Sequence, residues 1–450
     1  MPNLTSGRLG PVQNSKMKHV GVFMRVNLLS IAMALCIGLL PWNEKWNTIS
    51  IIVLFAGVLF DAVIKKRKYR LDLKRFFVGS GVFFVALLWL PLSDDLSTGW
   101  SYLERLLTAA LFPLLFSMVV KYCKLNIRYI FFAFMASCLF RYLFFLGGLL
   151  EFELLFILDY WNEVLIQFNQ FFKQKALHPS YFSMYLGFCA IICFYFYSIS
   201  KSLRQRSFWI GSLFVFLLIN LTLASKMPFV ATIAALIFGV AFHLYKTSGS
   251  RGRKRYIVGL VVGLVAFGVY IYKVPNVIKQ DIGNYYDYFS GKNSESLYDY
   301  NQYGTNYSLE TWNRTNRIHI WKSSISLLKA NFLLGVGTGD IRAELNNQYL
   351  VDGHPYLSNK DANTHNQYLD YFIKFGIFGF GILLFCFYTY VKSALNKSNP
   401  TYLMFLILAL MCMFTENILS RQLGIVFFFF FQSLFFFSES KEVKTSACTN

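Results

Sequence analysis

Long apolar stretches separated by short polar segments dominate the pattern of this chain. An α-helix needs about 20 consecutive apolar residues to cross a bilayer. By that measure the pattern predicts an all-α fold, a polytopic transmembrane bundle of about 12 spans. The predicted spans lie near residues 26–42, 47–64, 76–92, 104–120, 127–150, 178–200, 207–224, 227–245, 256–272, 366–391, 401–415 and 421–437.

Residues 151–177 are apolar enough to imitate a further span, but acidic and basic residues interrupt them. We interpret them as an amphipathic helix on the outer membrane surface, because a span here would move the later basic loops to the outside. The predicted organisation is then nine helices in 1–272, a large extracytoplasmic loop in 273–365, helices ten to twelve in 366–437, and a cytoplasmic tail in 438–450.

Composition and charge decide which side of the membrane each loop faces. The chain has 450 residues, 56% of them hydrophobic, and a net charge of +20. In a soluble protein such a charge would suggest nucleic acid as a partner. Here the basic residues form short blocks between apolar stretches, which is typical of cytoplasmic loops. We therefore predict membrane lipids and no nucleic acid as partners, with both termini in the cytoplasm.

The boundary between the long loop and the tenth predicted span carries several ionisable residues. We expect the helix to begin near Asn366, which places His365 in its N-cap region at the water–membrane boundary. Asp370 and Lys374 then lie one to two turns deeper, where charges are costly in lipid and usually face a polar cavity. The plainer alternative is a capped membrane helix with an interfacial histidine.

Two glycines follow on this helix, Gly376 and Gly379, and leave a smooth patch where another helix can approach. Residues 365–379 thus combine His, Asn, nine residues, Gly, two residues and Gly. This pattern resembles the O-antigen ligase superfamily. Its members are polytopic enzymes that move a glycan from undecaprenyl diphosphate to an acceptor outside the cytoplasmic membrane, and include ligases, some O-antigen polymerases and protein O-oligosaccharyltransferases.

An amphipathic helix is predicted in the long loop from Arg314 to Ala330. Arg317 and Arg314 share one helical face with four apolar residues, Ile318, Trp321, Ile325 and Leu328. Two guanidinium groups at the positive N-terminal end of a helix would clamp a diphosphate. Alternatively, they pair with loop carboxylates or reach lipid headgroups. We interpret Trp321 as a packing anchor rather than a sugar platform.

A Gly-x-Gly-x-Gly motif follows at Gly335, Gly337 and Gly339. No strand–turn–helix pattern surrounds it, so we predict a turn that returns the chain to the bilayer and not a nucleotide site. The order arginine, helix, tryptophan, Gly-Val-Gly and His-Asn extends the resemblance over about residues 314–379.

The tight outer turn between the seventh and eighth spans contains Ser225 and Lys226. In the superfamily this turn commonly reads Ser-Arg, and the arginine contacts the carrier phosphate. Lysine keeps the positive charge but loses the two-pronged geometry of arginine. Lys226 is therefore either a diphosphate ligand or an ordinary interfacial lysine.

Four further polar residues fall on the outer side in the predicted topology. We assign His178, Glu416 and Arg421 to the acceptor side, with a simple membrane-boundary role as the alternative for His178. Arg141 lies in the outer half of the fifth span, where an unpaired cation is costly. It either meets the carrier phosphate or pairs with an acidic residue just beyond the span.

The resemblance and these residues predict a ligase-type glycosyltransferase. His365 would act as the general base, because an imidazole with a pKa near 6.5 suits proton removal near neutral pH. Four cations would hold the diphosphate: Arg314, Arg317, Lys226 and Arg141. We predict no cofactor and no metal, since the eight cysteines show no metal-ligand spacing. The adjacent acids Asp94 and Asp95 are the exception to test.

The predicted partners are an undecaprenyl-diphosphate-linked glycan and an acceptor, in a multi-pass protein of the bacterial inner membrane. The acceptor is lipid A-core for a ligase, a growing polysaccharide for a polymerase, or a protein for an oligosaccharyltransferase. Outside this class, a lipid-linked glycan transporter would also need about 12 spans. A transporter would need neither the large outer loop nor the interfacial histidine.

Overall fold

The computed structural model describes residues 29–64, 71–120, 125–150, 178–223, 225–247 and 309–438, with the backbone alone at some helix ends, including 309–316. These ranges contain helices and no β-strand, which confirms the all-α prediction for them. Within them, six helices are long and apolar enough to cross a membrane, or seven if one bent pair counts as a single span. The chain is thus a multi-pass membrane protein, and the total of twelve spans stays a prediction.

Some predicted elements lie outside the described residues. These are the surface helix at 151–177, the ninth span at 256–272, the first part of the long loop at 273–308 and the tail from residue 439.

Two predicted boundaries are corrected between residues 71 and 119. The third span is a bent pair, α3 (Leu73–Gly79) and α4 (Gly81–Trp89), with an angle of 67° between its halves. The fourth span begins at residue 96 and not near 104, as α5 (Leu96–Leu106) continues into α6 (Thr108–Val119). Helix α5 starts early because the Asp95 side chain caps it by accepting the Thr98 N–H at 2.9 Å.

Close helix contacts flank the bend between α3 and α4. A Cβ atom at Gly79 would lie 3.0 Å from Pro113 Cβ of α6, and one at Gly81 would collide with Cys386 Sγ of α17 (Gln367–Asn396). Glycine permits both approaches, and the helix loses its continuity between them.

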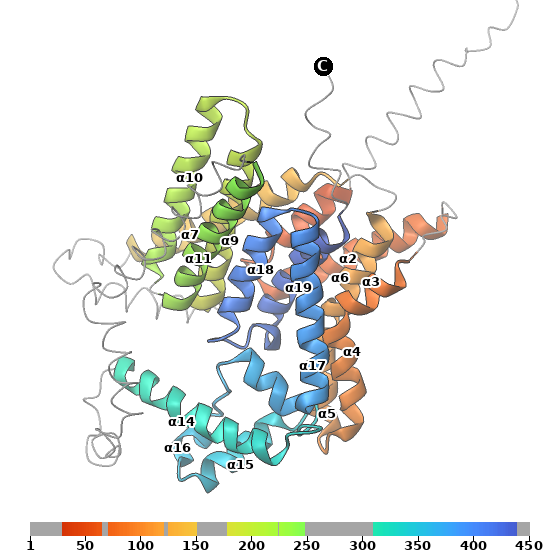
Figure 1. Cartoon of the computed structure of the whole chain (residues 1–450), viewed down its shortest axis with the longest axis vertical. Helices are drawn as coiled ribbons and strands as arrows, with labels where there is room; N and C mark the ends of the chain where they lie inside the picture. The colour runs from red at the N-terminus through yellow and green to blue at the C-terminus, as the bar shows by residue number, and fades with distance from the viewer. Residues whose placement is uncertain are drawn as a thin grey trace, which may run out of the picture.

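One side of the bundle is built around α9 (Pro179–Ile199), which packs against α10 (Leu203–Thr222), α11 (Lys226–Thr247), α18 (Pro400–Cys412) and α7 (Ile127–Leu150) (Figure 1). Most of α9 is buried, whereas α10 presents exposed apolar side chains along its length. Apolar side chains on an outer helix are expected where the surroundings are lipid.

Helix α19 (Gln422–Phe437) lies inside the bundle, and every residue from Leu423 to Phe437 is buried. Rings from α6, α7, α9 and α18 pack against its phenylalanines. A helix that is apolar on all sides needs other helices around it. Lys397 Nζ donates to the carbonyl oxygens of Phe435 and Phe436 at 2.9 and 2.7 Å and so caps its C-terminal end.

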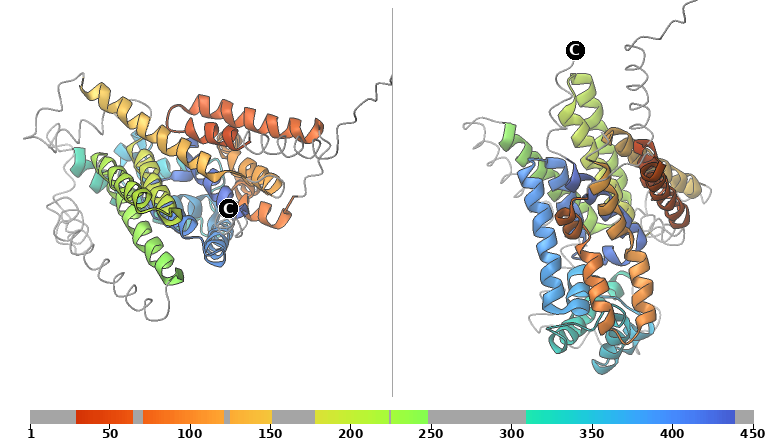
Figure 2. Two further views of the ribbon diagram at one scale, coloured as in Figure 1. Left: turned by 90° about the horizontal axis from the view of Figure 1, so that it is seen from above. Right: turned by 90° about the vertical axis from the view of Figure 1, so that its right-hand side faces the viewer.

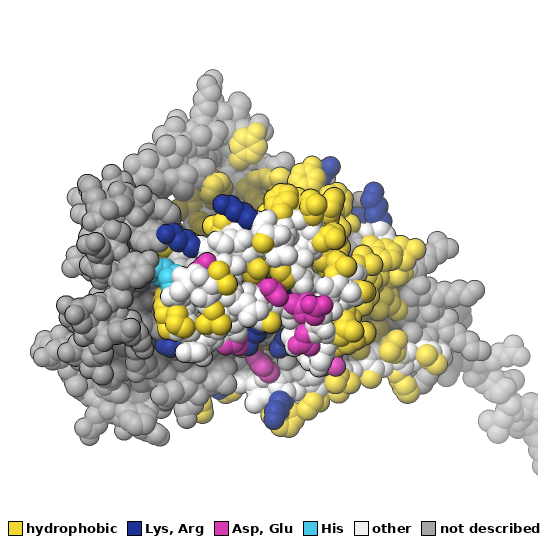
Figure 3. Space-filling view, turned by 90° about the horizontal axis from the view of Figure 1, so that it is seen from below, with side chains coloured by type: hydrophobic (Ala, Val, Ile, Leu, Met, Phe, Trp, Pro, Cys, Tyr) yellow, Lys and Arg dark blue, Asp and Glu magenta, His cyan; other side chains and the backbone are white. Residues whose placement is uncertain are grey.

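Residues 309–364 form a helical unit at the end of the molecule opposite α10 (Figures 1 and 2). The unit contains α14 (Leu309–Ala330), α15 (Ile341–Val351) and α16 (Pro355–Asn359). Its apolar core, which Ile373 of α17 completes, consists of Ile320, Leu327, Ile341, Leu345, Tyr349 and Leu357. Seen from this end, polar and acidic groups cover much of the described surface (Figure 3), which fits contact with water.

The predicted apolar face of α14 is wrong at one position. Ile318 is buried and Trp321 and Leu328 are partly buried, but Ile325 is 43% exposed. The face of α14 toward α15 contains Ile320 and Leu327 instead. These two side chains are buried because they pack into the core of the helical unit. The helix Leu29–Gly38 and α2 (Glu44–Ile64) belong to the N-terminal side of the bundle.

Candidate functional site

The tenth predicted span is a helix interrupted at Gly376, whose backbone has φ 59° and ψ −168°. Such a break leaves carbonyl groups of the preceding turn without helical partners. The N–H groups of Val336 and Gly337 supply them, donating to Ile373 O and Lys374 O at 2.9 and 3.0 Å. The glycine-rich turn of the outer unit therefore completes the hydrogen bonding of α17.

The glycine patch on this helix is only partly as predicted. At Gly379 the neighbour is indeed a helix, since a Cβ atom there would lie 3.1 Å from Val85 Cγ1 of α4. At Gly376 the prediction of a helix contact is wrong, because a Cβ atom would collide with Leu333 O of the loop. The space beside Gly376 is filled by the backbone of the loop that also supplies the missing hydrogen bonds of α17.

The chain around α4 and α5 holds the same turn from its other side. Trp89 Nε1 donates to Leu334 O at 2.7 Å. The Asp340 carboxylate accepts the backbone N–H groups of Asp94 and Asp95, both at 2.8 Å. The turn is thus inserted between α4 and α17, which explains the glycines without a nucleotide.

His365 lies in a strained turn just before α17. Its φ of 45° is uncommon for a residue with a side chain. The His365 N–H donates to Asn363 Oδ1 at 2.9 Å. Asn366 is the N-cap of α17, and its side chain accepts two helical N–H groups. The predicted helix start is confirmed, and the cap sets the direction of the residue before it.

Thr364 fixes this turn from two sides. Trp321 Nε1 donates to Thr364 O at 3.0 Å, which confirms Trp321 as an anchor between α14 and the turn. Thr364 Oγ1 lies 3.0 Å from Asn417 Nδ2 and 3.1 Å from Asn417 Oδ1. The position of His365 therefore depends on α14 and on the connection between α18 and α19.

Glu416 of that connection lies between three polar side chains. Ser180 Oγ donates to Glu416 Oε1 at 3.0 Å, and Arg317 Nη2 lies 3.9 Å from the same oxygen. His365 Nδ1 lies 4.0 Å from Glu416 Oε2, beyond hydrogen-bond distance. Among the described residues this buried nitrogen has no hydrogen-bond partner. We call His365, Glu416, Arg317 and Ser180 the Glu416 cluster.

The surroundings of His365 favour its neutral form. Burial lowers the pKa of His365 below its ordinary value, and the positive charge of Arg317 lowers it further. Glu416 acts in the opposite direction and raises the pKa, but the net change is downward. A neutral imidazole at pH 7 can accept a proton.

A protein-family model described as O-antigen ligase matches residues 211–385. This match, over 175 of the 450 residues, supports the resemblance to the O-antigen ligase superfamily. No curated protein matches the sequence. The match includes Arg317, His365 and the glycine-rich turn but ends before Glu416. The structure thus brings Glu416, from the connection between α18 and α19, close to two residues of the matched region, Arg317 and His365.

Two of the residues predicted for the acceptor side border the cluster. His178 is the N-cap of α9, and its Nδ1 accepts the Ser180 N–H at 3.4 Å. Arg421 is exposed at the start of α19. Both charges lower the pKa of His365, which places them near the imidazole.

The predicted diphosphate ligands are only partly gathered. Arg317 is in the cluster, whereas the side chain of Arg314 lies outside the described residues. Because α14 begins at Leu309, the two arginines are not at its N-terminal end, and that part of the prediction is wrong. Lys226 is exposed at the start of α11, and the preceding Ser225 Oγ donates to Ser180 Oγ at 3.4 Å. The Ser225–Lys226 turn therefore borders the cluster.

Lys374 does not face a polar cavity, so that prediction is wrong. Its Nζ lies 2.7 Å from Asp370 Oδ2, with both side chains 5% exposed, and 4.2 Å from the centre of the Tyr102 ring. Asn417 Nδ2 donates to Asp370 Oδ1 at 3.1 Å. We call Asp370, Lys374, Asn417 and Gln367 the Asp370 network. A charge deep in the membrane has here found a charged partner instead of water.

Nothing in the sequence marked Ser180 as a hydrogen-bond partner of Glu416. Nor did it mark Asn417 as the link between the cluster and the network. The available signal for Asn417 was its place beside Glu416 in the polar connection between the last two apolar stretches. The described residues contain no group of three side chains suited to a metal ion. Asp94 and Asp95 are engaged with the turn at Asp340 through their backbones.

Proposed function

We propose that this protein transfers a glycan from undecaprenyl diphosphate to an acceptor hydroxyl on the outer side of the bacterial inner membrane, with lipid A-core as the acceptor. Both termini would then lie in the cytoplasm. The match of residues 211–385 to the O-antigen ligase family supports a membrane glycosyltransferase. The observation that carries the proposal is the half-buried His365 imidazole, with a lowered pKa and a strained backbone, whose buried Nδ1 lies 4.0 Å from Glu416.

His365 would remove the proton from the acceptor. In the tautomer with its proton on Nδ1, toward Glu416, the free Nε2 is the basic nitrogen. The acceptor O–H bond breaks as its proton moves to Nε2, and the oxygen forms a bond to the anomeric carbon. The bond from that carbon to the diphosphate oxygen breaks, and its electron pair leaves with the diphosphate. Glu416 then stabilises the imidazolium.

The departing diphosphate needs positive charge close to the same place. Arg317 is the cation of the cluster, and we assign Arg314 and Lys226 to the same task because of their neighbouring positions. Lys374 is unsuited to this role, since its ammonium already pairs with Asp370. The reaction needs no nucleotide or other cofactor, because the bond to the carrier diphosphate is already activated.

The same site would serve a polymerase or a protein glycosyltransferase, and these acceptors are distinguished in cells. Full-length glycan left on the lipid carrier after gene deletion indicates a ligase, whereas collapse of the glycan-size ladder indicates a polymerase. A lipid-linked glycan transporter is separated by reconstitution. Purified protein that transfers glycan when the donor is already on the correct side is an enzyme.

The test of the base replaces His365 while keeping its backbone conformation. His365→Asn and His365→Gly both tolerate positive φ, and we expect each to reduce transfer by at least about 100-fold, as for loss of a general base. Ser398→Ala is the matched control, because Ser398 has a similar φ of 51° at the opposite end of α17. Near wild-type transfer by both His365 variants, at normal membrane levels, would refute the assignment.

A further inference from the structure

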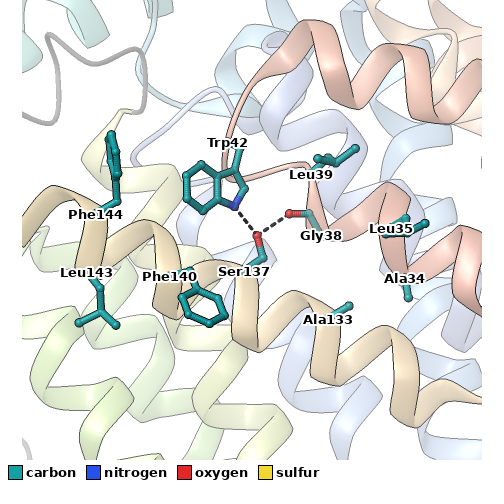
Figure 4. Close-up of a pocket in the computed structure, with 10 residues that line it drawn as sticks. All are labelled: Ala34, Leu35, Gly38, Leu39, Trp42, Ala133, Ser137, Phe140, Leu143 and Phe144. Atoms are coloured by element: carbon teal, nitrogen blue, oxygen red, sulfur yellow. Dashed lines mark hydrogen bonds between the residues drawn. The ribbon is translucent and has the colours of Figure 1, made fainter.

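An apolar groove lies outside the Glu416 cluster, between the helix Leu29–Gly38 and α7 (Figure 4). Its volume is about 690 Å³, and its walls include Leu35, Phe140 and Phe144, whose side chains are about 60% exposed. The groove is therefore open toward the lipid side of the bundle. An apolar groove of this kind suits a hydrocarbon chain.

A polar pair lies midway along the groove, with apolar lining residues on both sides of it (Figure 4). Trp42 Nε1 donates to Ser137 Oγ at 2.8 Å, and Ser137 Oγ donates to Gly38 O across the groove (Figure 4). Arg141 follows Ser137 by one helical turn on α7, so the two side chains share a face. The guanidinium group of Arg141 packs against Trp42 and Phe144, two rings of the groove wall.

Arg141 is 9% exposed and lies among aromatic rings. Its guanidinium carbon is 4.4 Å from the ring centre of Phe145, 5.1 Å from that of Trp42 and 5.7 Å from that of Phe144. Two of these rings also line the groove. Among the described residues Arg141 has no carboxylate partner, and its Nε has no hydrogen bond. A buried cation without an anion is costly, and a bound anion removes that cost.

Side-chain contacts link the part of the groove near Arg141 to the reaction site. Tyr142, next to Arg141, shares a hydrogen bond of 3.1 Å with Thr222 at the end of α10. The turn that follows Thr222 carries Ser225, which reaches the cluster through Ser180. On the other side of the groove, the outer connection after Trp42 leads to Glu44, whose carbonyl accepts from Gln422 Nε2 at 3.5 Å. The groove therefore leads toward the cluster from the lipid.

We propose that the groove holds the isoprenoid chain of the polyprenyl diphosphate donor, with Arg141 bound to a phosphate oxygen. This rests on the proposed function, because it identifies the donor's lipid site. A diphosphate carries more negative charge than a zwitterionic phospholipid headgroup and gains more from an unpaired guanidinium. The path toward the cluster favours a substrate over a lipid that merely surrounds the protein.

The test measures binding and not only transfer. The full-length protein in detergent is photo-crosslinked to undecaprenyl diphosphate that carries a photoreactive group near the end of its chain. We expect crosslinks on residues that line the groove, such as Leu35 and Phe140. Arg141→Gln should weaken binding by about ten- to a hundredfold, because a charge-assisted hydrogen bond is lost.

Two matched variants separate the groove from the rest of α7. Ala133→Phe places a ring in the groove, whereas Ala136→Phe makes the same change at an exposed position on the same helix that does not line it. We expect about a tenfold loss of crosslinking for Ala133→Phe and no loss for Ala136→Phe. Equal crosslinking of both variants, or equal displacement of the probe by phosphatidylglycerol, would overturn the proposal. Groove crosslinking by a protein that transfers no glycan would refute the proposed function and leave this site standing.

Discussion

The Glu416 cluster and the Asp370 network each place a carboxylate beside a cation, but they differ in how completely their polar atoms are paired. In the network, Asp370 accepts from Lys374 at 2.7 Å and from Asn417 at 3.1 Å. In the cluster, Arg317 and His365 remain 3.9 and 4.0 Å from Glu416. A network with satisfied hydrogen bonds stabilises a fold, whereas unpaired groups at a partly open site are ready to bind.

The link between the two groups is short. Asn417 belongs to the network and follows Glu416 directly, and it also bonds Thr364, which precedes His365. The Asp370 network thereby sets the positions of Glu416 and His365 in the Glu416 cluster. Variants of the network should therefore change stability, while variants of the cluster should change activity alone.

The largest expected effect is the loss of the buried pair. Lys374→Met leaves the Asp370 carboxylate buried without its cation, and we expect a loss of about 3–5 kcal/mol in the free energy of unfolding. The measurement is thermal or denaturant unfolding of the purified protein in detergent. Lys392→Met is the control, since Lys392 is exposed on the same helix. Unchanged stability of Lys374→Met would show that the network does not hold the fold.

A somewhat smaller loss is expected at the break in α17. Gly376→Ala introduces a side chain at φ 59°, where it also meets Leu333 O, so the strain should cost about 2–3 kcal/mol. The same unfolding experiment measures it. Gly381→Ala on the same helix has open space around the new Cβ atom and should be nearly neutral. If the two variants are equally stable, the loop does not press against Gly376.

His319 is a buried histidine outside the Glu416 cluster, and we expect its titration to change stability. Burial lowers the pKa of His319 to about 4, and His354, whose ring centre is 4.2 Å away, adds to the effect. Because folding lowers the pKa of His319, protonation of this histidine opposes folding of the unit α14–α16. The unit therefore has its full stability above pH 6.5 and loses stability as the pH falls from 6.5 toward 4. At pH 5 the loss is about 2 kcal/mol.

Hydrogen exchange of the α15 amides at pH 7 and pH 5, corrected for the intrinsic rates, measures this loss. His319→Phe removes the titrating group and should abolish most of the pH dependence. A pH dependence that persists unchanged in His319→Phe would assign it to other groups.

The smallest of these effects is expected for a change at Glu416 of the cluster. Glu416→Gln removes the charge that raises the pKa of His365, so the acid limb of the kcat/KM profile should move to lower pH. The loss of the carboxylate beside the imidazolium should also reduce the rate by about tenfold. Glu344→Gln, in α15, is the control carboxylate. A lower rate without a displaced acid limb would mean that Glu416 does not act through His365.

The sequence by itself determined the features that depend on neighbouring residues. Apolar stretches indicated most of the described helices, because burial in lipid requires a continuous run of apolar side chains. The start of α17 at Asn366 and of α9 at His178 followed from local capping. The motif from His365 to Gly379 pointed to the superfamily before any contact was known.

Only the tertiary structure decided which polar residues meet. Ser180 and Glu416 are 236 positions apart, and Thr364 and Asn417 are 53 apart, so no local pattern predicts either contact. Whether Lys374 met a cavity or a carboxylate depended on its neighbours, as did the loop at Gly376 and the aromatic surroundings of Arg141. Local periodicity predicts where a helix forms, but the packing of the other helices decides the partner of each charge, because a charge away from water is costly until an opposite charge or a bound ligand pairs with it.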